Sequence, residues 1–225
     1  MLTSQWARWR FEKTLAALSR TPIAALQHYA AQQWPTPDCP LDEAPLLALD
    51  FELDGLRRGA HLLQAGWLPF SGQTLSLANA VSRDIRSAAT LDPRAVTIHG
   101  IGEQRAARGE SIDTVLADLI EALGGRVMVA HAAAIEREAL QGAVRKLFGA
   151  HLPIRQICTL TLEQRLEPGL RSTDAYRLMA CRQRYGLPEY TAHDALTDAL
   201  AAAELFQAQL TRLAPDITLA QIENA

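Results

Sequence analysis

The sequence predicts an α/β protein built on a mixed β-sheet with helices on both of its faces. Apolar stretches joined by short links come first, between residues 46 and 80, and predict neighbouring antiparallel strands. Short apolar strands that each lead into a helix follow, at residues 126–148 and from residue 153 onward. Because strand–helix units favour parallel pairing, the chain as a whole predicts a sheet with both kinds of pair.

Composition limits what such a protein can be. The chain has 225 residues, 48% of them hydrophobic, and a net charge of −3. A chain of this length can bury one full core, so we expect one main domain. There is no global basic field of the kind that dominates non-specific nucleic-acid binding, so any nucleic acid would have to be held locally. The three cysteines lie far apart, without the close pair spacings of a zinc site.

The amino-terminal region predicts a helical extension followed by a proline-rich linker, over residues 1–44. Apolar residues at helical spacing indicate two helices between residues 4 and 33, separated at Thr21-Pro22, where threonine can cap and proline suits a first turn. Its tryptophans could form a docking face for a protein partner, although aromatic residues at helical spacing more often pack on the chain's own domain. The charged amino terminus and the lack of a membrane-length apolar run lead us to expect a soluble, cytoplasmic protein with no membrane partner.

The unbroken apolar run over residues 46–56 predicts a central strand covered on both faces. Asp50 and Glu52 point to the same side at its carboxyl end, because alternate residues of a strand share a face. Two anions held this close repel unless a cation lies between them, and a hard divalent ion such as Mg²⁺ prefers oxygen ligands. Taken alone, the pattern also fits an ordinary strand end with solvated acids.

The next two strands are expected at residues 60–70 and 73–80, joined by a hairpin turn at residues 69–73. Residues 81–109 predict an irregular loop, since glycines and an Asp-Pro pair interrupt them. The remaining elements alternate between helix and strand. They are helices at 111–123, 132–148, 174–185 and 191–213, strands at 126–130 and 153–158, a short helix from Thr159, and a tail from Pro215.

Titratable side chains occur where these later elements begin. Glu136 lies early in the helix after the second apolar strand, and His193 and Asp198 lie near the start of the last helix. A five-residue separation turns about 140° on a continuous helix, so His193 and Asp198 share a cleft only if the histidine lies in the lead-in to the first turn. Four carboxylates from three segments would then meet beside a histidine whose pKa suits proton transfer near neutrality.

The motifs that carry these residues are Asp50-Phe51-Glu52-x-x-Gly55-Leu56, His131-Ala132-Ala133-Ala134-Ile135-Glu136, and His193-Asp194-Ala195-Leu196-x-Asp198-Ala199. They closely resemble the three motifs of the DEDDh exonucleases, the DnaQ-like family that contains polymerase proofreading subunits and ribonuclease T. The segment Ile98-His99-Gly100-Ile101 also resembles the family's substrate-loop histidine segment. The resemblance covers roughly residues 45 to 212, and the order and spacing of the motifs make the combination specific.

The resemblance implies a ribonuclease H-like, five-stranded mixed sheet in an exonuclease domain at residues 45–214, followed by a tail at 215–225. It also implies removal of nucleoside 5′-monophosphates from single-stranded 3′ ends, with two divalent metal ions, Mg²⁺ or Mn²⁺. DNA is the favoured polymer and RNA the close second. The rival interpretation is a non-catalytic subunit that keeps the fold and binds a protein partner through residues 1–44.

The resemblance also assigns roles to residues. Asp50 would bridge the metal ions, and the carboxylates that complete the site would be Glu52, Glu136 and Asp198. His193 would be the general base that deprotonates the attacking water, with a helix-capping histidine as the alternative.

Substrate contacts follow from the same resemblance. His99 would help to seat the terminal nucleotide, and Leu53 would be a further substrate contact. For His99 and His131, a histidine bonded to nearby backbone is an equally acceptable interpretation.

The second motif departs from the family pattern. The family usually has aspartate where this chain has Glu136, with asparagine four residues earlier where this chain has Ala132. The longer side chain moves the carboxylate oxygens by about one C–C bond, and Mg²⁺ tolerates little geometric error. We nevertheless expect Glu136 to contribute to the metal site.

Overall fold

The structure is a computed structural model that describes residues 2–55 and 60–223. Its centre is a five-stranded sheet with the strand order β3-β2-β1-β4-β5. The strands are β1 Leu46–Leu53, β2 Leu62–Phe70, β3 Val81–Asp84, β4 Val127–Ala130 and β5 Gln156–Cys158. β1 pairs antiparallel with β2, and β2 with β3, whereas β4 runs parallel to both β1 and β5. The predicted mixed sheet is therefore confirmed.

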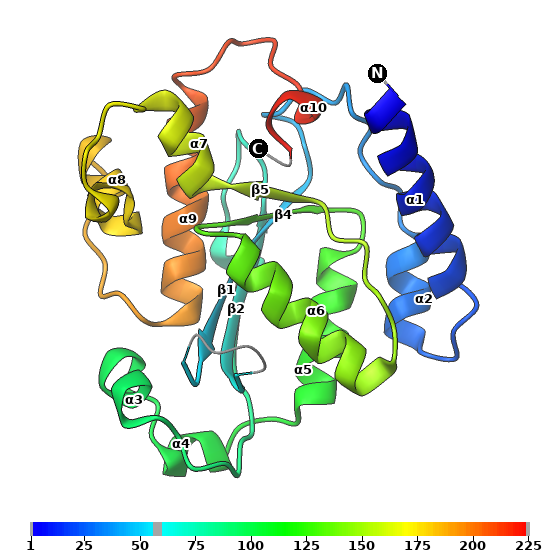
Figure 1. The fold of residues 1–225 in the computed structure, drawn as a ribbon, viewed down its shortest axis with the longest axis vertical. Helices are drawn as coiled ribbons and strands as arrows, with labels where there is room; N and C mark the ends of the chain where they lie inside the picture. Colours follow the sequence, from blue (N-terminus) through cyan, green and yellow to red (C-terminus); the bar gives the residue numbers. More distant parts are fainter. Residues whose placement is uncertain (1, 56–59, 224–225) are drawn as a thin grey trace.

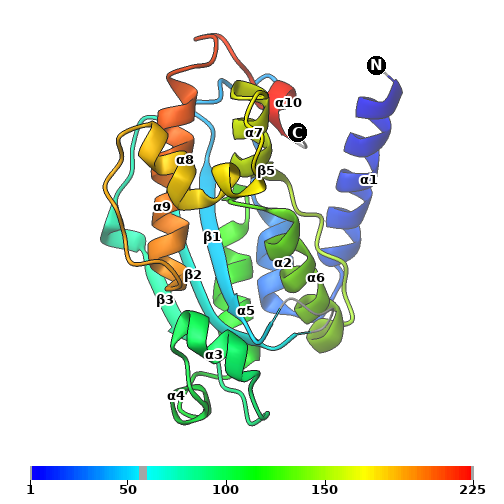
Figure 2. The same cartoon turned by 60° about the vertical axis from the view of Figure 1, so that its left-hand side comes forward.

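Helices cover both faces of the sheet, as Figures 1 and 2 show. The helices are α1 Leu2–Leu18, α2 Ala24–Ala31, α3 Pro93–His99, α4 Glu103–Ala107, α5 Ile112–Leu123, α6 Ala134–Phe148, α7 Thr159–Leu166, α8 Leu178–Arg184, α9 Ala195–Leu210 and α10 Leu219–Ile222, with short 3₁₀ helices η1 Leu77–Asn79 and η2 Thr173–Tyr176. Along β1, Leu47 and Leu49 pack in the core that includes α2, α5 and α6. Leu46 and Ala48 pack in the opposite core, with α7, α9 and α10. The period-two alternation of the strand thus divides the interior into two layers.

The two ends of the chain pack differently against this frame. α1 and α2 separate at the expected break, and Tyr29 of α2 is fully buried, with its hydroxyl donating to the Pro153 carbonyl at 2.7 Å. On α1, Trp6 and Trp9 stay 62% and 52% exposed. At the other end, Leu219 of α10 is fully buried in the core under α9. Both termini therefore contribute residues to the interior, while the outer face of α1 does not.

The third strand of the sheet differs from the prediction. Residues 73–80, expected as a strand, form a turn and η1, and the pairing strand is β3 at residues 81–84. β3 has one apolar residue, Val81, which lies opposite Trp67 of β2. Its pairing is decided by the neighbouring strand rather than by its own composition, because strand preference depends on tertiary context.

The predicted irregular loop at residues 81–109 is also wrong, since it contains α3 and α4 besides β3. The Asp92-Pro93 pair begins α3 instead of breaking the chain. Asp92 accepts a hydrogen bond from the N–H of Arg94, and Pro93 occupies the first turn, where its missing N–H costs nothing. Gly100 ends α3 in the left-handed conformation at φ 69°.

Three predicted element boundaries also differ from those in the structure. The helix expected at 174–185 is divided into η2 and α8 at Arg177, and α9 begins at Ala195 rather than at Thr191. The first predicted strand ends at Leu53, and Leu56 lies outside the described residues. Among the residues that the structure describes, no helix combines the length and apolarity needed to cross a membrane.

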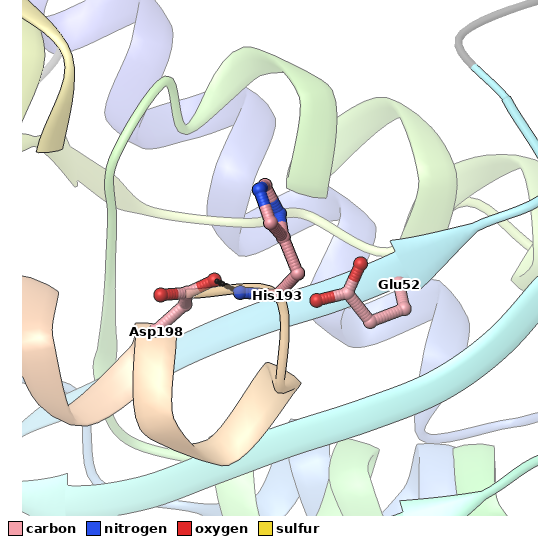
Figure 3. Close-up of side chains that lie close together, drawn as sticks. All are labelled: Glu52, His193 and Asp198. Carbon is pink, nitrogen blue, oxygen red and sulfur yellow. Dashed lines mark hydrogen bonds between the residues drawn. The ribbon is translucent and has the colours of Figure 1, made fainter. Parts of the chain in front are cut away.

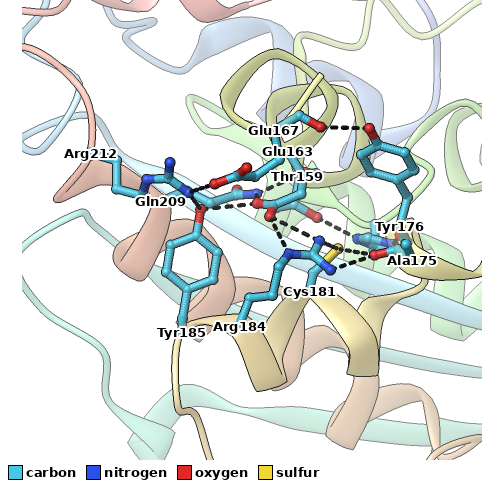
Figure 4. Close-up of polar contacts among 11 residues, drawn as sticks. Thr159, Glu163, Glu167, Ala175, Tyr176, Cys181, Arg184, Tyr185, Gln209 and Arg212 are labelled. Carbon is cyan, nitrogen blue, oxygen red and sulfur yellow. Dashed lines mark hydrogen bonds and ion pairs between the residues drawn. The ribbon is translucent and has the colours of Figure 1, made fainter. Parts of the chain in front are cut away.

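A buried polar network joins the helices on the α9 side of the sheet (Figure 4). Glu163 of α7 is fully buried, and its carboxylate accepts hydrogen bonds from Arg184 of α8 at 2.9 Å and from the Tyr185 hydroxyl at 3.0 Å. Gln209 of α9 donates to the same carboxylate at 2.8 Å. A buried charge needs such partners, so the network ties α7 and α8 to the helix that carries Asp198.

Candidate metal and catalytic site

The site begins where β1 continues beyond the end of its pairing with β4. The last residues paired between β1 and β4 are Ala48 and Val129, so the end of β1 leaves β4 behind and runs on beside β2 alone. Asp50 is directly opposite Gly66 of β2, and Glu52 is opposite Gln64. Opposite residues of an antiparallel pair share a face, so both carboxylates and both β2 residues lie on the side covered by α9.

Gly66 allows α9 to approach that face. A Cβ atom added at Gly66 would lie 2.1 Å from the backbone nitrogen of Leu196 and 2.2 Å from the carbonyl carbon of Ala195. No side chain fits at such distances, so the first turn of α9 rests directly on the backbone of β2. This contact sets the height of Asp198 above the sheet.

Side-chain hydrogen bonds from Gln64 of β2 hold the same end of α9. The Gln64 side-chain oxygen accepts from the N–H of Ala195 at 3.0 Å, and its nitrogen donates to Asp194 at 3.3 Å. Asp194 in turn caps α9 by accepting from the N–H of Thr197 at 3.0 Å. The start of α9 is therefore held by β2, the strand next to the acidic one.

Glu52, His193 and Asp198 come together at this helix start (Figure 3). One ligand atom from each of the three lies within 4.8 Å of the others. His193 precedes α9 and has a positive φ of 69°, and its backbone N–H donates to the Asp198 carboxylate at 2.8 Å. That hydrogen bond supports an uncommon conformation for a residue other than glycine. The lead-in position leaves the imidazole exposed beside the carboxylates of Glu52 and Asp198.

The carboxylates repel one another. Burial, followed by the charges of Glu136, Asp198 and Glu52, raises the pKa of Asp50 well above its ordinary value. Burial also raises the pKa of Glu52 to about 7, with Asp198 and Asp194 adding to the shift. The pKa of Asp198 rises by burial too, opposed by the hydrogen bond from the His193 backbone. Ionising each of these buried carboxylates therefore costs free energy, and nearby negative charges add to that cost.

Glu136 belongs to the same group although its side chain is longer than the family's aspartate. It is 4% exposed, and burial raises its pKa to about 8. The backbone N–H of Phe51, on the part of β1 beyond β4, donates to this carboxylate and opposes the shift. The second oxygen, Oε2, has no hydrogen-bond partner among the described residues. Glu136 thus brings an unpartnered buried acceptor to the end of β1.

The donor set fits a hard divalent cation. Arg105 is the cation that lowers the pKa of Glu52, but it is already paired with Asp84 at 2.7 Å. Mg²⁺ and Mn²⁺ bind clustered carboxylate oxygens in proteins. The carboxylates at the end of β1 are partly or fully buried, and one of their oxygens, Oε2 of Glu136, has no hydrogen-bond partner among the described residues.

The other predicted site residues lie in different surroundings. His99 ends α3 and is 7% exposed, with Nδ1 accepting from the N–H of Ile101 at 3.0 Å. Its Nε2 has no partner among the described residues, and burial, together with nearby His193, lowers its pKa. His99 therefore lies near His193, and one of its buried ring nitrogens has no partner among the described residues. Leu53 packs on the face of the sheet opposite the one that holds Asp50 and Glu52.

His131 is bonded at both ring nitrogens, as the alternative interpretation expects. Nδ1 lies 2.9 Å from the Thr159 hydroxyl, and Nε2 lies 2.9 Å from the Tyr176 carbonyl. Burial lowers its pKa to about 4, which keeps the ring neutral. The histidine links β4 to α7 and η2, and Ala132 after it takes a positive φ of 62°.

Three residues of the site were missed from the sequence. Gly66 and Gln64 lie inside an apolar strand, and Asp194 lies in the same motif as Asp198, directly after His193. A glycine in a strand interior is a signal of close backbone approach, and a glutamine in a buried strand signals a polar partner. Those signals indicate a contact without indicating which segment makes it.

These features define a ribonuclease H-like exonuclease fold with an acidic site at the end of its central strand. A family model described as Exonuclease (RNase_T) matches residues 47–206. The chain therefore belongs to this exonuclease family, which confirms the resemblance of its motifs.

Individual relatives agree with that assignment. Exonuclease X in complex with 5′ overhanging duplex DNA is 25% identical with a TM-score of 0.58, covering 78% of this chain and 98% of that one. Exonuclease I of E. coli in a complex with single-stranded DNA is 18% identical with a TM-score of 0.66, covering 75% of this chain and 41% of that one, and supports the fold.

A curated relative also matches by sequence. The PolC-type DNA polymerase III of Thermotoga petrophila is 27% identical over 177 residues, or 75% of this chain. The match spans only 12% of that polymerase's length.

Proposed function

We propose that the protein is a metal-dependent 3′–5′ exonuclease that hydrolyses phosphodiester bonds at single-stranded 3′ ends and releases nucleoside 5′-monophosphates. The observation that carries this proposal is the meeting of Glu52 and Asp198 with His193 beside Asp50, whose pKa the charges of Glu136, Asp198 and Glu52 raise. Anions that destabilise one another in a fold are retained where a bound cation offsets them. Membership of the exonuclease family gives the reaction class.

The four carboxylates would hold two divalent cations, Mg²⁺ or Mn²⁺, which supply Lewis-acid activation of water and offset negative charge at the leaving oxygen. Asp50 would be a ligand at the centre of the group, since the charges of both Glu136 on α6 and Asp198 on α9 raise its pKa. The unpartnered Oε2 of Glu136 would supply the ligand atom from the α6 side.

His193 is the general base of the proposed reaction. Its exposed imidazole takes the proton of the attacking water, whose oxygen forms a bond to the terminal phosphorus. The bond from that phosphorus to the 3′ oxygen of the preceding nucleotide breaks, and this oxygen takes up a proton. The products are a nucleoside 5′-monophosphate and a strand shortened by one nucleotide.

The polymer is proposed to be DNA in preference to RNA. Exonuclease X and Exonuclease I are each described with bound DNA, and the sequence relative is a DNA polymerase. His99 would seat the terminal nucleotide through its free Nε2. Leu53 remains a proposed substrate contact, and it would act from the far side of the β1 end.

The test is release of labelled mononucleotides from 3′-labelled single-stranded DNA and RNA, with and without Mg²⁺ or Mn²⁺. We expect release that EDTA abolishes and that Asp50→Asn lowers by at least about a hundredfold, because the central metal ligand is lost. Asp113→Asn is the matched control, since it removes a carboxylate from the start of α5. Equal rates for Asp50→Asn and the wild type would contradict the assignment.

The second candidate is a non-catalytic subunit that binds a protein partner through residues 1–44. The specific observation in its favour is the exposure of Trp6 and Trp9 on α1, outside the family match. Deleting the whole extension would also remove Tyr29 from the core, so Trp6→Ala/Trp9→Ala is the cleaner variant. No nucleotide release from either polymer, with a partner lost in that variant, would favour this candidate over the enzyme.

A further inference from the structure

A wide groove runs between α1 and α6, apart from the acidic site. α1 stands away from α6 on one side of the molecule (Figure 2), and side chains of both helices line the space between them. The groove has a volume of about 1600 Å³. Pockets for small ligands rarely exceed about 1,000 Å³, so the size suits a polymer segment.

The charge of this groove is opposite to that of the chain. Its lining contains five cationic side chains and one acid, whereas the whole sequence has 22 lysines and arginines against 25 acids. The lining cations are Arg10, Arg86, Arg137, Arg145 and Lys146, and the acid is Glu138. All five cations are exposed, and none forms an ion pair with another residue that the structure describes. A local positive field of this kind attracts a polyanion.

The groove reaches the carboxyl end of β1 on the sheet face opposite the one that holds Asp50 and Glu52. Leu53 and Ile135 both line it, and each is the chain neighbour of a site residue, Glu52 in β1 and Glu136 in α6. From there the lining follows α6 as far as Lys146 and α1 as far as Ala7. A strand whose end lies among the carboxylates can therefore pass over the end of β1 into the groove.

We propose that the α1–α6 groove holds the phosphodiester backbone of the substrate strand upstream of its 3′ end. This inference rests on the proposed exonuclease function and adds a second contact region to it. Arginine's planar fork suits phosphate oxygens, and positively charged grooves with adjoining aromatic rings bind single strands without reading their sequence. Trp6 supplies such a ring, because it is 62% exposed and has the guanidinium of the groove residue Arg10 5.4 Å from its centroid.

The test compares long and short substrates in Arg145→Glu/Lys146→Glu. The matched control is Lys13→Glu/Arg20→Glu, which makes the same change in charge at exposed positions outside the groove. The substrates are single strands of DNA and of RNA of roughly 30 nucleotides, and the p-nitrophenyl ester of thymidine 5′-monophosphate, which is too short to reach the groove. Thermal unfolding followed by circular dichroism checks that both variants fold.

We expect KM for the long strands to rise about tenfold in the groove variant, and the slope of log KM against log salt concentration to fall by about 1.4, for two lost phosphate contacts. The control should match the wild type, and all three proteins should hydrolyse the short ester at the same rate. DNA and RNA should respond alike if the backbone is what the groove holds, whereas an effect on one polymer alone would add a sugar contact to it.

Equal KM values and salt slopes for the two variants on both long strands would overturn the proposal. A wild-type protein that cleaves nothing would refute the proposed activity, and the groove would then be judged by fluorescence anisotropy of the same labelled strands in EDTA. Weaker binding in the groove variant and not in the control would still support the groove. Equal binding by both variants would reject it.

Discussion

Gly66→Ala is the substitution whose effect can be worked most directly from the structure. The new Cβ would lie 2.1 Å from the Leu196 nitrogen and 2.2 Å from the Ala195 carbonyl carbon, while real Cβ atoms essentially never come within 3.0 Å of such atoms. The first turn of α9 must therefore move away by at least 3.0 − 2.1 = 0.9 Å. Asp198 and the His193 lead-in would move with it, away from Glu52.

A displacement of this size should reduce the nuclease rate by about a hundredfold, because catalytic groups lose their alignment over about 1 Å. The free energy of unfolding should fall by about 1–3 kcal/mol, the usual effect of overpacking. Mononucleotide release and urea denaturation measure the two quantities.

The control for this substitution is Gly142→Ala, in the middle of α6, where an added Cβ meets nothing within 4 Å. It should raise the free energy of unfolding by about 0.5–1 kcal/mol, because alanine favours helix over glycine. If Gly66→Ala kept the wild-type rate and stability, the direct contact of α9 with β2 would not be what positions Asp198.

Two further predictions concern the second motif. Glu136→Ala should lower the metal-dependent nuclease rate at least about tenfold, because it removes a buried carboxylate that we propose as a metal ligand, and an unchanged rate would remove Glu136 from the mechanism. Should the wild type be inactive with Mg²⁺ and Mn²⁺ alike, activity restored by Glu136→Asp would identify a degenerate enzyme. His131 has a folded-state pKa of about 4 against an ordinary 6.5, so its contribution to stability is complete above pH 6.5 and is lost as the pH falls toward 4. Between pH 7 and 4.5 the wild type should lose about 2.5 kcal/mol more unfolding free energy than His131→Gln. Equal losses in urea denaturation at the two pH values would show that the histidine is not held neutral.

Much of the frame was predictable because local patterns were strong. The apolar run at Leu46 and the alternation that follows it indicate a strand covered on both faces, and β1 is that strand. The same holds for α5, whose apolar periodicity ends at Gly124. β3 and α3 were missed for opposite reasons. β3 has almost no pattern of its own, while α3 begins at an Asp-Pro pair that acts as a cap here and as a breaker elsewhere.

The sequence by itself determined the family and the identity of the acids, since three ordered motifs around Asp50, Glu136 and Asp198 do not depend on coordinates. Only the tertiary structure decided how those acids meet. The contact of α9 with Gly66 and the hydrogen bond between Glu136 and Phe51 join segments far apart in the chain. Each depends on the part of β1 that extends beyond β4 and pairs with β2. Such distances are set by the packing of the whole sheet, and no local pattern of residues carries them.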